Sequence, residues 1–271
     1  MSSYRKRWFA GIVAVMFLGP LACGAAPTAS AKRTLQETPM ATVATVRVAA
    51  AAEVFVPIYS SRCGVPLGIT SISYDDSFYG GKTFNVVHLA RHTKTKGVGL
   101  YFFQLTEQTN AYKASTGVDI FPLIRNSGQY VGNHTYNHAN LVTSSSTRVR
   151  WQIGAGAPSG WLRPPGGASN ASVRSIAYSL KVDVCTWTYD SRDWARVNGK
   201  FPTGAQICQK VVANAPKGAV ILLHLNHSAA TYVAMDCIIN GLRAKGHSIC
   251  RPYSATHPGV ATPAKLYKLP C

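Results

Sequence analysis

The chain has 271 residues, of which 46% are hydrophobic and only 14% charged, a composition that favours a large packed core and argues against a disordered chain. Its formal net charge of +18 at pH 7 favours a polyanionic neighbour. Lys and Arg form no compact run interleaved with aromatic residues, so no specific nucleic-acid interaction is indicated.

Residues 1–31 have the pattern of a signal peptide: basic residues, then a short apolar stretch, then a small-residue cleavage site ending at Ala31. A retained membrane anchor is the alternative, but Gly19-Pro20 breaks the apolar stretch. Lipid attachment at Cys23 is a further alternative. No later apolar run approaches the roughly 20 residues of a spanning helix. We therefore expect a secreted or cell-envelope protein whose basic surface faces an anionic envelope. Dispersed solvated charge is the competing interpretation.

Cysteine usage agrees with export. Without the signal segment the chain keeps an even set of cysteines: Cys63, Cys185, Cys208, Cys237, Cys250 and Cys271. An oxidising compartment favours three disulfides, although the sequence leaves their pairing open and buried free thiols remain an alternative. No CxxC pair occurs, which argues against a thiolate zinc site.

Residues 32–64 are rich in Ala, Thr and Val and are interpreted as a linker or N-terminal extension. From about residue 65 the pattern alternates between strand and helix. Strands are predicted at 67–74, 98–103, 130–132, near Trp161, and at 182–187, 219–223 and 247–250. Helices are predicted at 82–95, 118–125, 170–180, 204–214 and 232–245. This alternation indicates parallel βαβ units, and about seven strands fit a barrel better than an open sheet. We expect one α/β catalytic domain over 65–271.

Polar residues recur where the predicted strands end. They are Asp75, Asp76, His134, Arg163, Asp190, Asp193 and His224. In parallel barrels the functional residues lie at the carboxyl ends of the strands, so these side chains are expected to gather at one end of the domain.

His134 and His138 are spaced to share one face of a helical turn. Such a pair is common on solvated helices, but a nearby carboxylate would complete a three-ligand site with open positions. Asp75 and Asp76 are adjacent, so one could bind a metal while the other faces a substrate. An Asp pair that merely starts a turn is the alternative.

The remaining strand ends offer supporting chemistry. Arg163 could hold a carboxylate ionised, and the Pro and Gly residues after it predict a stiff loop that approaches a ligand closely. Asp193 could orient a histidine, and Trp194 could form a wall of a sugar pocket. His224 is a candidate general acid. Taken singly, each residue is more typical of a surface turn or of a structural role.

Together, these residues resemble the five ordered motifs of polysaccharide deacetylases with a nodulation-protein-B-like domain, carbohydrate esterase family 4. The matching segments are Ser73–Ser77, His134–His138, Arg163–Gly166, Asp190–Trp194 and Leu222–His224. They span about residues 65–252, and five motifs in the family order are far more specific than any one of them.

The resemblance implies a distorted (β/α)₇ TIM-like barrel with a divalent metal, typically Zn²⁺, held by Asp76, His134 and His138. Asp75 would be the general base on a water molecule, with Arg163 holding it.

The same resemblance makes His224 the acid that protonates the leaving amine, tuned by Asp193. The backbone N–H of Gly166 would stabilise the oxyanion. Pro165 and Trp194 would complete the contacts with the substrate.

Three departures from the family pattern concern the loops. Ser77 stands where the first motif usually has glycine, and Gly166 replaces the usual aromatic residue of the third. Residues 139–162 form a short connection that is expected to lack a full helix.

The favoured function is removal of N-acetyl groups from an N-acetylhexosamine polysaccharide, either peptidoglycan or chitin-like. An O-acetyl esterase acting on a xylan-type polymer would use the same residues. A non-catalytic envelope or carbohydrate-binding protein, and a basic nucleic-acid binder, are further hypotheses. The presence of both Asp75 and His224 favours an enzyme, because binding alone requires neither.

Overall fold

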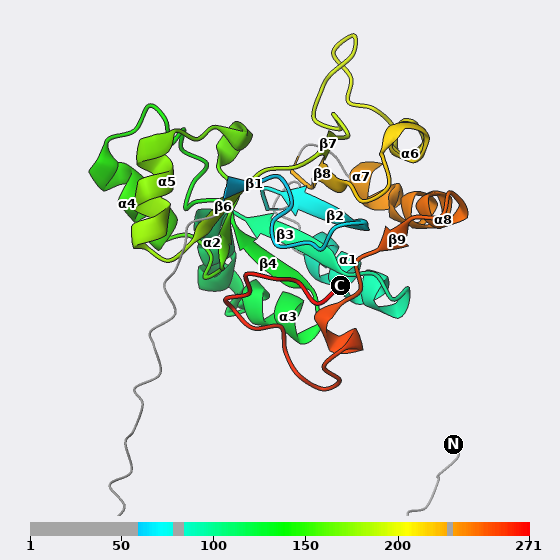
Figure 1. Cartoon of the computed structure of the whole chain (residues 1–271), viewed down its shortest axis with the longest axis horizontal. Helices are drawn as coiled ribbons and strands as arrows, with labels where there is room; N and C mark the ends of the chain where they lie inside the picture. Colours follow the sequence, from blue (N-terminus) through cyan, green and yellow to red (C-terminus); the bar gives the residue numbers. More distant parts are fainter. Residues whose placement is uncertain (1–58, 78–83, 227–229) are drawn as a thin grey trace, which may run out of the picture. The chain divides into compact units, whose positions relative to one another are not determined.

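The computed structural model describes residues 59–77, 84–226 and 230–271 (Figure 1). The expected signal peptide at 1–31 and most of the 32–64 segment lie outside these residues. Within the described part, no helix is both long and apolar enough to cross a membrane.

A curled parallel sheet forms the centre of the domain. Its strands are β1 (Tyr59–Ser60), β2 (Ile69–Asp75), β3 (Leu100–Gln104), β4 (Tyr130–Asn133), β5 (Trp161–Leu162), β6 (Asp183–Cys185), β7 (Tyr189–Asp190) and β8 (Val220–His224). They pair in the order β1-β6-β5-β4-β3-β2-β8-β7, and β9 (Ser248–Ile249) pairs with the start of β2. The middle strands are buried along nearly their whole length, as parallel strands covered by helices are.

One chain segment joins the two ends of this sheet. β6 pairs with β5, whereas β7 pairs with β8 at the opposite end, and only residues 186–188 separate β6 from β7. The N–H of Thr188 also donates to the carbonyl of Val220, at 3.0 Å. The predicted strand at 182–187 is therefore a bent segment that closes the sheet into the expected distorted barrel.

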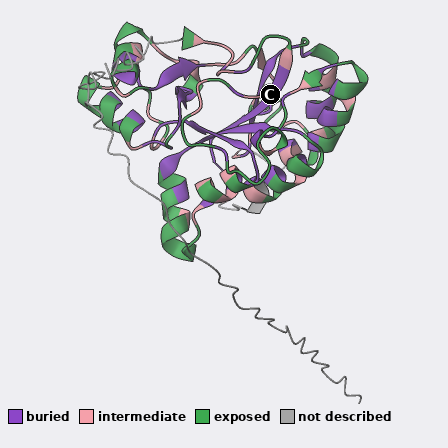
Figure 2. Cartoon of the chain, turned by 60° about the horizontal axis from the view of Figure 1, so that its bottom comes forward, coloured by how far each residue is buried: buried purple, intermediate pink, exposed green. Residues whose placement is uncertain are grey.

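Helices cover the outside of the sheet, with their buried faces toward it (Figure 2). They are α1 (Phe84–Thr95), α2 (Thr106–Thr116), α3 (Ile120–Asn126), α4 (Ser146–Gly154), α5 (Ala171–Ser179), α6 (Gly204–Asn214), α7 (Ala230–Val233) and α8 (Met235–Ala244). Several begin at a side-chain cap. At α6, Thr203 and Gln206 form a capping box that satisfies the free N–H groups of the first turn.

Two expectations about these elements need correction, and one helix was missed. The 139–162 connection contains a full helix, α4, which begins at the cap Ser145. Helix α2 was not predicted, because its sequence has almost no apolar periodicity. Residues 59–64 are part of the barrel and not a linker, since β1 pairs with β6 and Cys63 is fully buried.

All six cysteines of the described chain pair. Cys63 bonds Cys185 and ties β1 to β6, Cys208 bonds Cys237 between α6 and α8, and Cys250 bonds Cys271. Three disulfides are therefore present, as expected, and free thiols are excluded for these residues.

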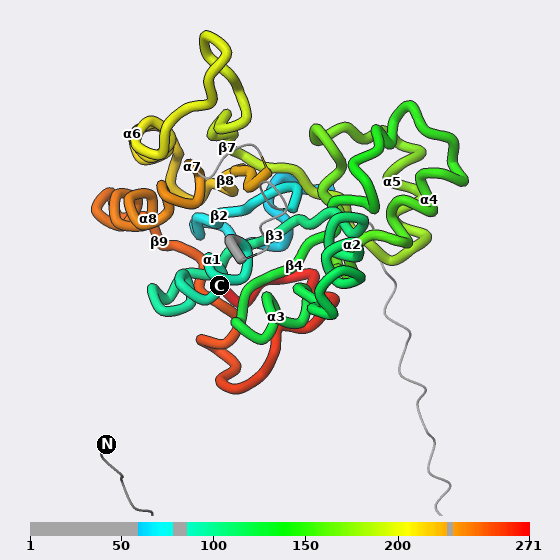
Figure 3. Tube along the Cα trace, turned by 180° about the vertical axis from the view of Figure 1, so that it is seen from behind, coloured from blue at the N-terminus to red at the C-terminus, as the bar shows by residue number. Residues whose placement is uncertain are grey.

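The C-terminal segment covers the end of the barrel at which the strands begin (Figures 1 and 3). The N–H of Gly99 donates to the carbonyl of Cys250, and the N–H of Leu269 donates to the carbonyl of Gly64. A Cβ atom at Gly99 would collide with the carbonyl of Arg251, so only glycine permits this approach. The opposite end of the barrel, where the strands finish, is not covered by this segment and can hold a functional site.

Candidate functional site

A cleft of about 670 Å³ lies at the carboxyl ends of the strands and holds most of the predicted site residues. Its lining includes Asp75, Asp76, His134, His138, Gly166, Asp190, Trp194 and His224, and also Leu105, Gln108, Trp187, Leu222 and Asn226. Arg163 and Asp193 are buried behind this lining. Pro165 is buried as well and does not line the cleft, contrary to its expected contact with substrate.

Asp76, His134 and His138 converge on one point. Asp76 Oδ1 lies 3.5 Å from His134 Nε2 and 3.4 Å from His138 Nε2, and one ligand atom from each residue lies within 4.8 Å of the others. Asp76 and His138 both adopt φ of 64°, a left-handed conformation that residues with a Cβ avoid unless their surroundings hold them there. The backbone is therefore strained at two of the three converging residues.

The bonding at this point fits a divalent cation. Asp76 Oδ1 is buried and has no hydrogen-bond partner among the described residues. His134 Nδ1 lies 2.7 Å from the carbonyl of Arg163, and because a carbonyl only accepts, Nδ1 carries the proton. The lone pair of Nε2 therefore faces Asp76. One carboxylate and two imidazoles, with a backbone carbonyl fixing a ring, is a donor set that suits catalytic zinc.

The charges of the three residues are coupled. Burial raises the pKa of Asp76, but the positive charge that His134, His138 and His224 can carry outweighs burial and lowers that pKa well below its usual value. Burial lowers the pKa of His134, yet the charges of Asp75 and Asp76 raise it overall. A proton and a cation therefore compete for His134 Nε2.

The two histidines lie on a turn and not on the helical turn that their spacing suggested. Thr135 has φ of 73°, and its N–H donates to Asn133 Oδ1 at 2.8 Å. Gln152 of α4 accepts the N–H groups of Tyr136 and Asn137 at 3.1 and 3.2 Å. Sequence reasoning missed the side chains of Asn133 and Gln152, because no sequence motif marks an amide that accepts hydrogen bonds from the backbone. The imidazoles still meet, with ring centroids 5.1 Å apart.

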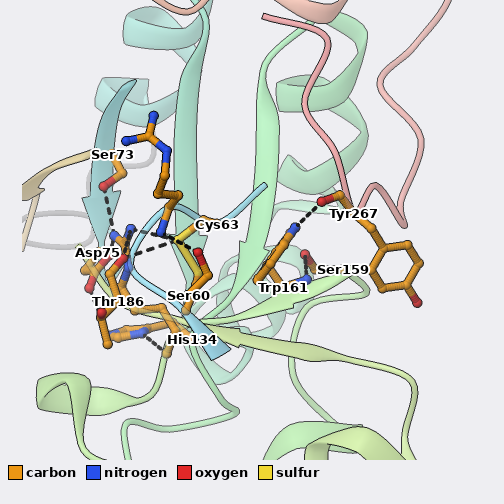
Figure 4. The surroundings of a disulfide bond; sticks show 12 residues. Ser60, Cys63, Ser73, Asp75, His134, Ser159, Trp161, Thr186 and Tyr267 are labelled. Atoms are coloured by element: carbon orange, nitrogen blue, oxygen red, sulfur yellow. Dashed lines mark hydrogen bonds and ion pairs between the residues drawn. A yellow bond between two sulfur atoms is a disulfide. The ribbon is translucent and has the colours of Figure 1, made fainter. Parts of the chain in front are cut away.

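Arg163 holds Asp75 from below the cleft. Its Nη1 donates to Asp75 Oδ1 at 2.6 Å and to Ser73 Oγ at 2.8 Å, and the side chain is fully buried. Its Nη2 donates to the carbonyl of Thr186 at 3.0 Å and contacts the sulfur of Cys63 at 3.4 Å (Figure 4). Asp75 Oδ2 remains for the cleft, 3.8 Å from His134 Nε2.

His224 faces Asp75 from the neighbouring strand, since the two are register partners in β2 and β8. Asp193 Oδ1 lies 2.9 Å from His224 Nδ1, while Asp193 Oδ2 accepts the backbone N–H of His224 and the hydroxyl of Thr231. Burial lowers the pKa of His224, but the hydrogen bond and charge of Asp193, then Asp75 and Asp76, raise it overall. The geometry favours a protonated imidazole at this position.

The first-motif departure has a clear structural use. Ser77 is fully buried, and its hydroxyl contacts both the N–H and the carbonyl of Leu105 at 3.2 Å. Gln104 donates to the carbonyl of Asp76 at 2.7 Å. The loop that carries the two aspartates is thus tied to the end of β3.

The third-motif departure opens the cleft. Gly166 has φ of 61°, and a Cβ placed on it would meet nothing within 4 Å. The cleft wall is provided elsewhere by Trp187 and by Trp194, which is 40% exposed and donates through Nε1 to Asp190. Sequence reasoning missed Trp187 because it precedes the motif that contains Trp194.

Comparisons with known proteins identify a family and several relatives of this chain. A family model described as polysaccharide deacetylase matches residues 68–185. A peptidoglycan-N-acetylglucosamine deacetylase of Bacillus cereus is 28% identical over 191 residues, which is 66% of this chain and 84% of the relative. A bifunctional xylanase/xylan deacetylase of Cellvibrio japonicus is 29% identical over 195 residues, 69% of this chain and 27% of the relative.

Solved structures show the same fold. The crystal structure of a peptidoglycan N-acetylglucosamine deacetylase superposes with a TM-score of 0.59 at 25% identity and covers 70% of this chain and 89% of that one. Several curated relatives are larger proteins. The chain spans 42% of an uncharacterized Bacillus subtilis protein and 26% of a Listeria monocytogenes peptidoglycan deacetylase.

Proposed function

Because the chain carries a polysaccharide deacetylase domain of the carbohydrate esterase family 4 type, we propose that it is a metal-dependent hydrolase that removes N-acetyl groups from an N-acetylhexosamine polysaccharide. One observation carries the proposal. The cluster of Asp76, His134 and His138 shares one cleft with a carboxylate held by Arg163 and an imidazole held by Asp193. Amide hydrolysis needs a base for the water and an acid for the amine in this arrangement.

Asp76, His134 and His138 would hold the metal, and the donor set of one oxygen and two nitrogens suits Zn²⁺. When bound, the ion would act as a Lewis acid and lower the pKa of water to about 7. His138 is half-exposed, which leaves the open side of the site toward the cleft.

Asp75 is the proposed general base. Its Oδ1 is occupied by Arg163, so Oδ2 accepts the proton of the attacking water. The paired guanidinium fixes the rotamer of the carboxylate. General acid–base help of this kind contributes typically about 10²–10⁴-fold.

His224 is the proposed acid. Because Nδ1 is bonded to Asp193, Nε2 is the nitrogen that gives its proton to the departing amine. The backbone N–H of Gly166, in the cleft lining, would donate to the acetyl oxygen as negative charge develops there. Aromatic faces of Trp187 and Trp194 would stack on sugar rings.

The substrate is proposed to be peptidoglycan or a chitin-like polymer, in line with the names of the Bacillus relatives. Such a polymer lies outside the cytoplasm, which agrees with the expected export signal and with three disulfides. The protein would accordingly be secreted or held at the envelope.

An O-acetyl esterase is the second candidate, because one relative is named as a xylan deacetylase. The same residues would serve, since an alkoxide is far less basic than the amide anion that an unprotonated amine would leave as, and ester hydrolysis therefore asks less of His224.

Acetate release from N-acetylglucosamine oligomers tests the proposal, with a chelator added and zinc then restored. Release that stops with chelator and returns with zinc supports a metal-dependent N-deacetylase. Release only from acetylated xylan would establish the esterase instead. Metal binding without release from either polymer would leave a non-catalytic carbohydrate-binding protein.

A further inference from the structure

A second cavity, of about 910 Å³, lies beside the catalytic cleft. It is formed by the connection from β7 to α6, which projects from the barrel (Figures 1 and 3), and by the first turns of α6. The lining residues that matter here are Ser191, Arg192, Ala195, Arg196, Lys200 and Lys210. We call it the basic groove.

The charge in the basic groove is of one sign. Its lining contains four exposed cations, Arg192, Arg196, Lys200 and Lys210, and no acidic residue. None of the four is within 4.0 Å of a carboxylate in the part of the chain that the structure describes. The nearby Asp193 is buried and bonded to His224. Like charges that gather without counterions favour binding of an anion.

Two of the cations are held in place. Arg196 donates through Nη1 to the carbonyl of Gly199 at 3.0 Å, and its guanidinium lies 4.2 Å from the centre of the Phe201 ring. Arg192 lies 5.4 Å from the ring of Trp194. A guanidinium restrained in this way loses little side-chain entropy when it pairs with a carboxylate or phosphate.

The basic groove adjoins the catalytic cleft through one short segment. Asp190 and Trp194 line the cleft, whereas Ser191, Arg192 and Ala195 line the groove. A polymer that stacks on Trp194 in the cleft therefore passes next to Arg192. The two sites also differ in the charge of their linings, since the cleft is lined by three carboxylates, Asp75, Asp76 and Asp190, and the described lining of the groove by none.

We propose that the basic groove is an accessory subsite for anionic groups carried by the polysaccharide substrate. The preferred substrate is then an N-acetylated polymer that bears carboxylate or phosphate groups, and not a neutral chitin-like or xylan-like chain. This inference rests on the proposed deacetylase function.

The test compares matched N-acetylglucosamine oligomers whose primary hydroxyls carry a neutral hydroxyethyl group, a carboxymethyl group or a phosphate. Acetate release should give a higher kcat/KM for the anionic oligomers. The preference should shrink from 0.05 to about 0.5 M salt, because the Debye length falls below about 5 Å. The carboxymethyl and phosphate oligomers show which anion the groove favours.

Two double variants isolate the groove. R196Q with K200Q should reduce the anionic-to-neutral kcat/KM ratio roughly three- to tenfold, since each exposed ion pair contributes modestly. K265Q with K268Q removes the same charge from the C-terminal segment at the other end of the barrel and should keep the ratio. Both lysines are exposed.

The outcomes separate the two proposals. Acetate release from all oligomers with equal kcat/KM, or an equal effect of both double variants, overturns the subsite and leaves the deacetylase standing. No release from any oligomer overturns the deacetylase. In that case, calorimetric binding of the carboxymethyl oligomer, lost only in R196Q with K200Q, still supports the groove. Tighter groove-dependent binding of single-stranded DNA would assign it to nucleic acid instead.

Discussion

Arg163 Nη1 and Asp75 Oδ1 lie 2.6 Å apart, with both side chains buried. A buried carboxylate bonded to a fully buried guanidinium keeps one rotamer, because breaking a buried ion pair is strongly unfavourable. The pair therefore leaves Asp75 with one committed oxygen and one oxygen available to the cleft.

Replacing Asp75 by Asn should keep the metal and abolish most turnover. Asn retains the shape of the side chain and an acceptor for Arg163, but it cannot take a proton. We expect kcat to fall about 10²–10⁴-fold while zinc content by atomic absorption stays near one equivalent. Near-normal turnover in Asp75→Asn would refute the base assignment.

His134→Ala should lose metal and activity together. The variant removes one ligand of three, so zinc affinity is expected to fall at least about 100-fold, as measured by competition with a chelating dye. His257→Ala is the matched control, because His257 is stacked on Tyr253 away from the cleft. Unchanged zinc affinity in His134→Ala would show that the cluster does not bind the ion.

Asp193→Asn should shift the pH profile. His224 must be protonated to act as an acid, so the rate is lost as pH rises through its pKa. Asp193 raises that pKa against the effect of burial, and removing its charge lowers the pKa. The alkaline limb of kcat should therefore move to lower pH. Asp190→Asn, which removes a carboxylate bonded to Trp194, should move it less. Equal shifts would argue against His224 as the acid.

The Cys63–Cys185 disulfide should matter for activity as well as stability. The double variant Cys63→Ala with Cys185→Ala removes a disulfide whose cysteines are 122 residues apart in the sequence. In the comparison variant, Cys208→Ala with Cys237→Ala, the separation is 29 residues. By the chain-entropy model, losing the first disulfide should lower the free energy of unfolding by about 5 kcal/mol, and losing the second by about 4 kcal/mol. Both double variants should have a lower Tm than the unmodified protein. Only the first should reduce kcat below the unfolding transition, since Cys63 contacts Arg163. Equal kcat in both variants would count against this coupling.

Much of the barrel could be predicted because the parallel strands are continuous apolar runs. Val220–Leu223 is one of them, and His224 breaks the pattern where the strand ends. Charged residues at such breaks mark the cleft, which is why Asp75, Asp76 and His134 could be placed together from the sequence.

The elements that escaped prediction lack such a pattern. Helix α2 buries only Thr106 and Thr109 among its eleven residues, so no apolar face marks it. Gln152 positions the turn that carries His134 and His138 by accepting hydrogen bonds from backbone N–H groups. Any polar residue of α4 could make such bonds, so the sequence does not single out Gln152. The link from Arg163 to Cys63 depends on a strand, β1, of only two residues.

Strand β2 stands at the middle of the sheet, yet its neighbour β8 arrives very late in the chain: Ser73 bonds the carbonyl of Ile221 across 148 residues. Contacts between such distant residues form slowly, because a long loop must close first. Until β8 is available, one edge of β2 stays unpaired and open to association with other chains. The domain should accordingly fold as one cooperative unit, and a fragment that ends after β6 should aggregate.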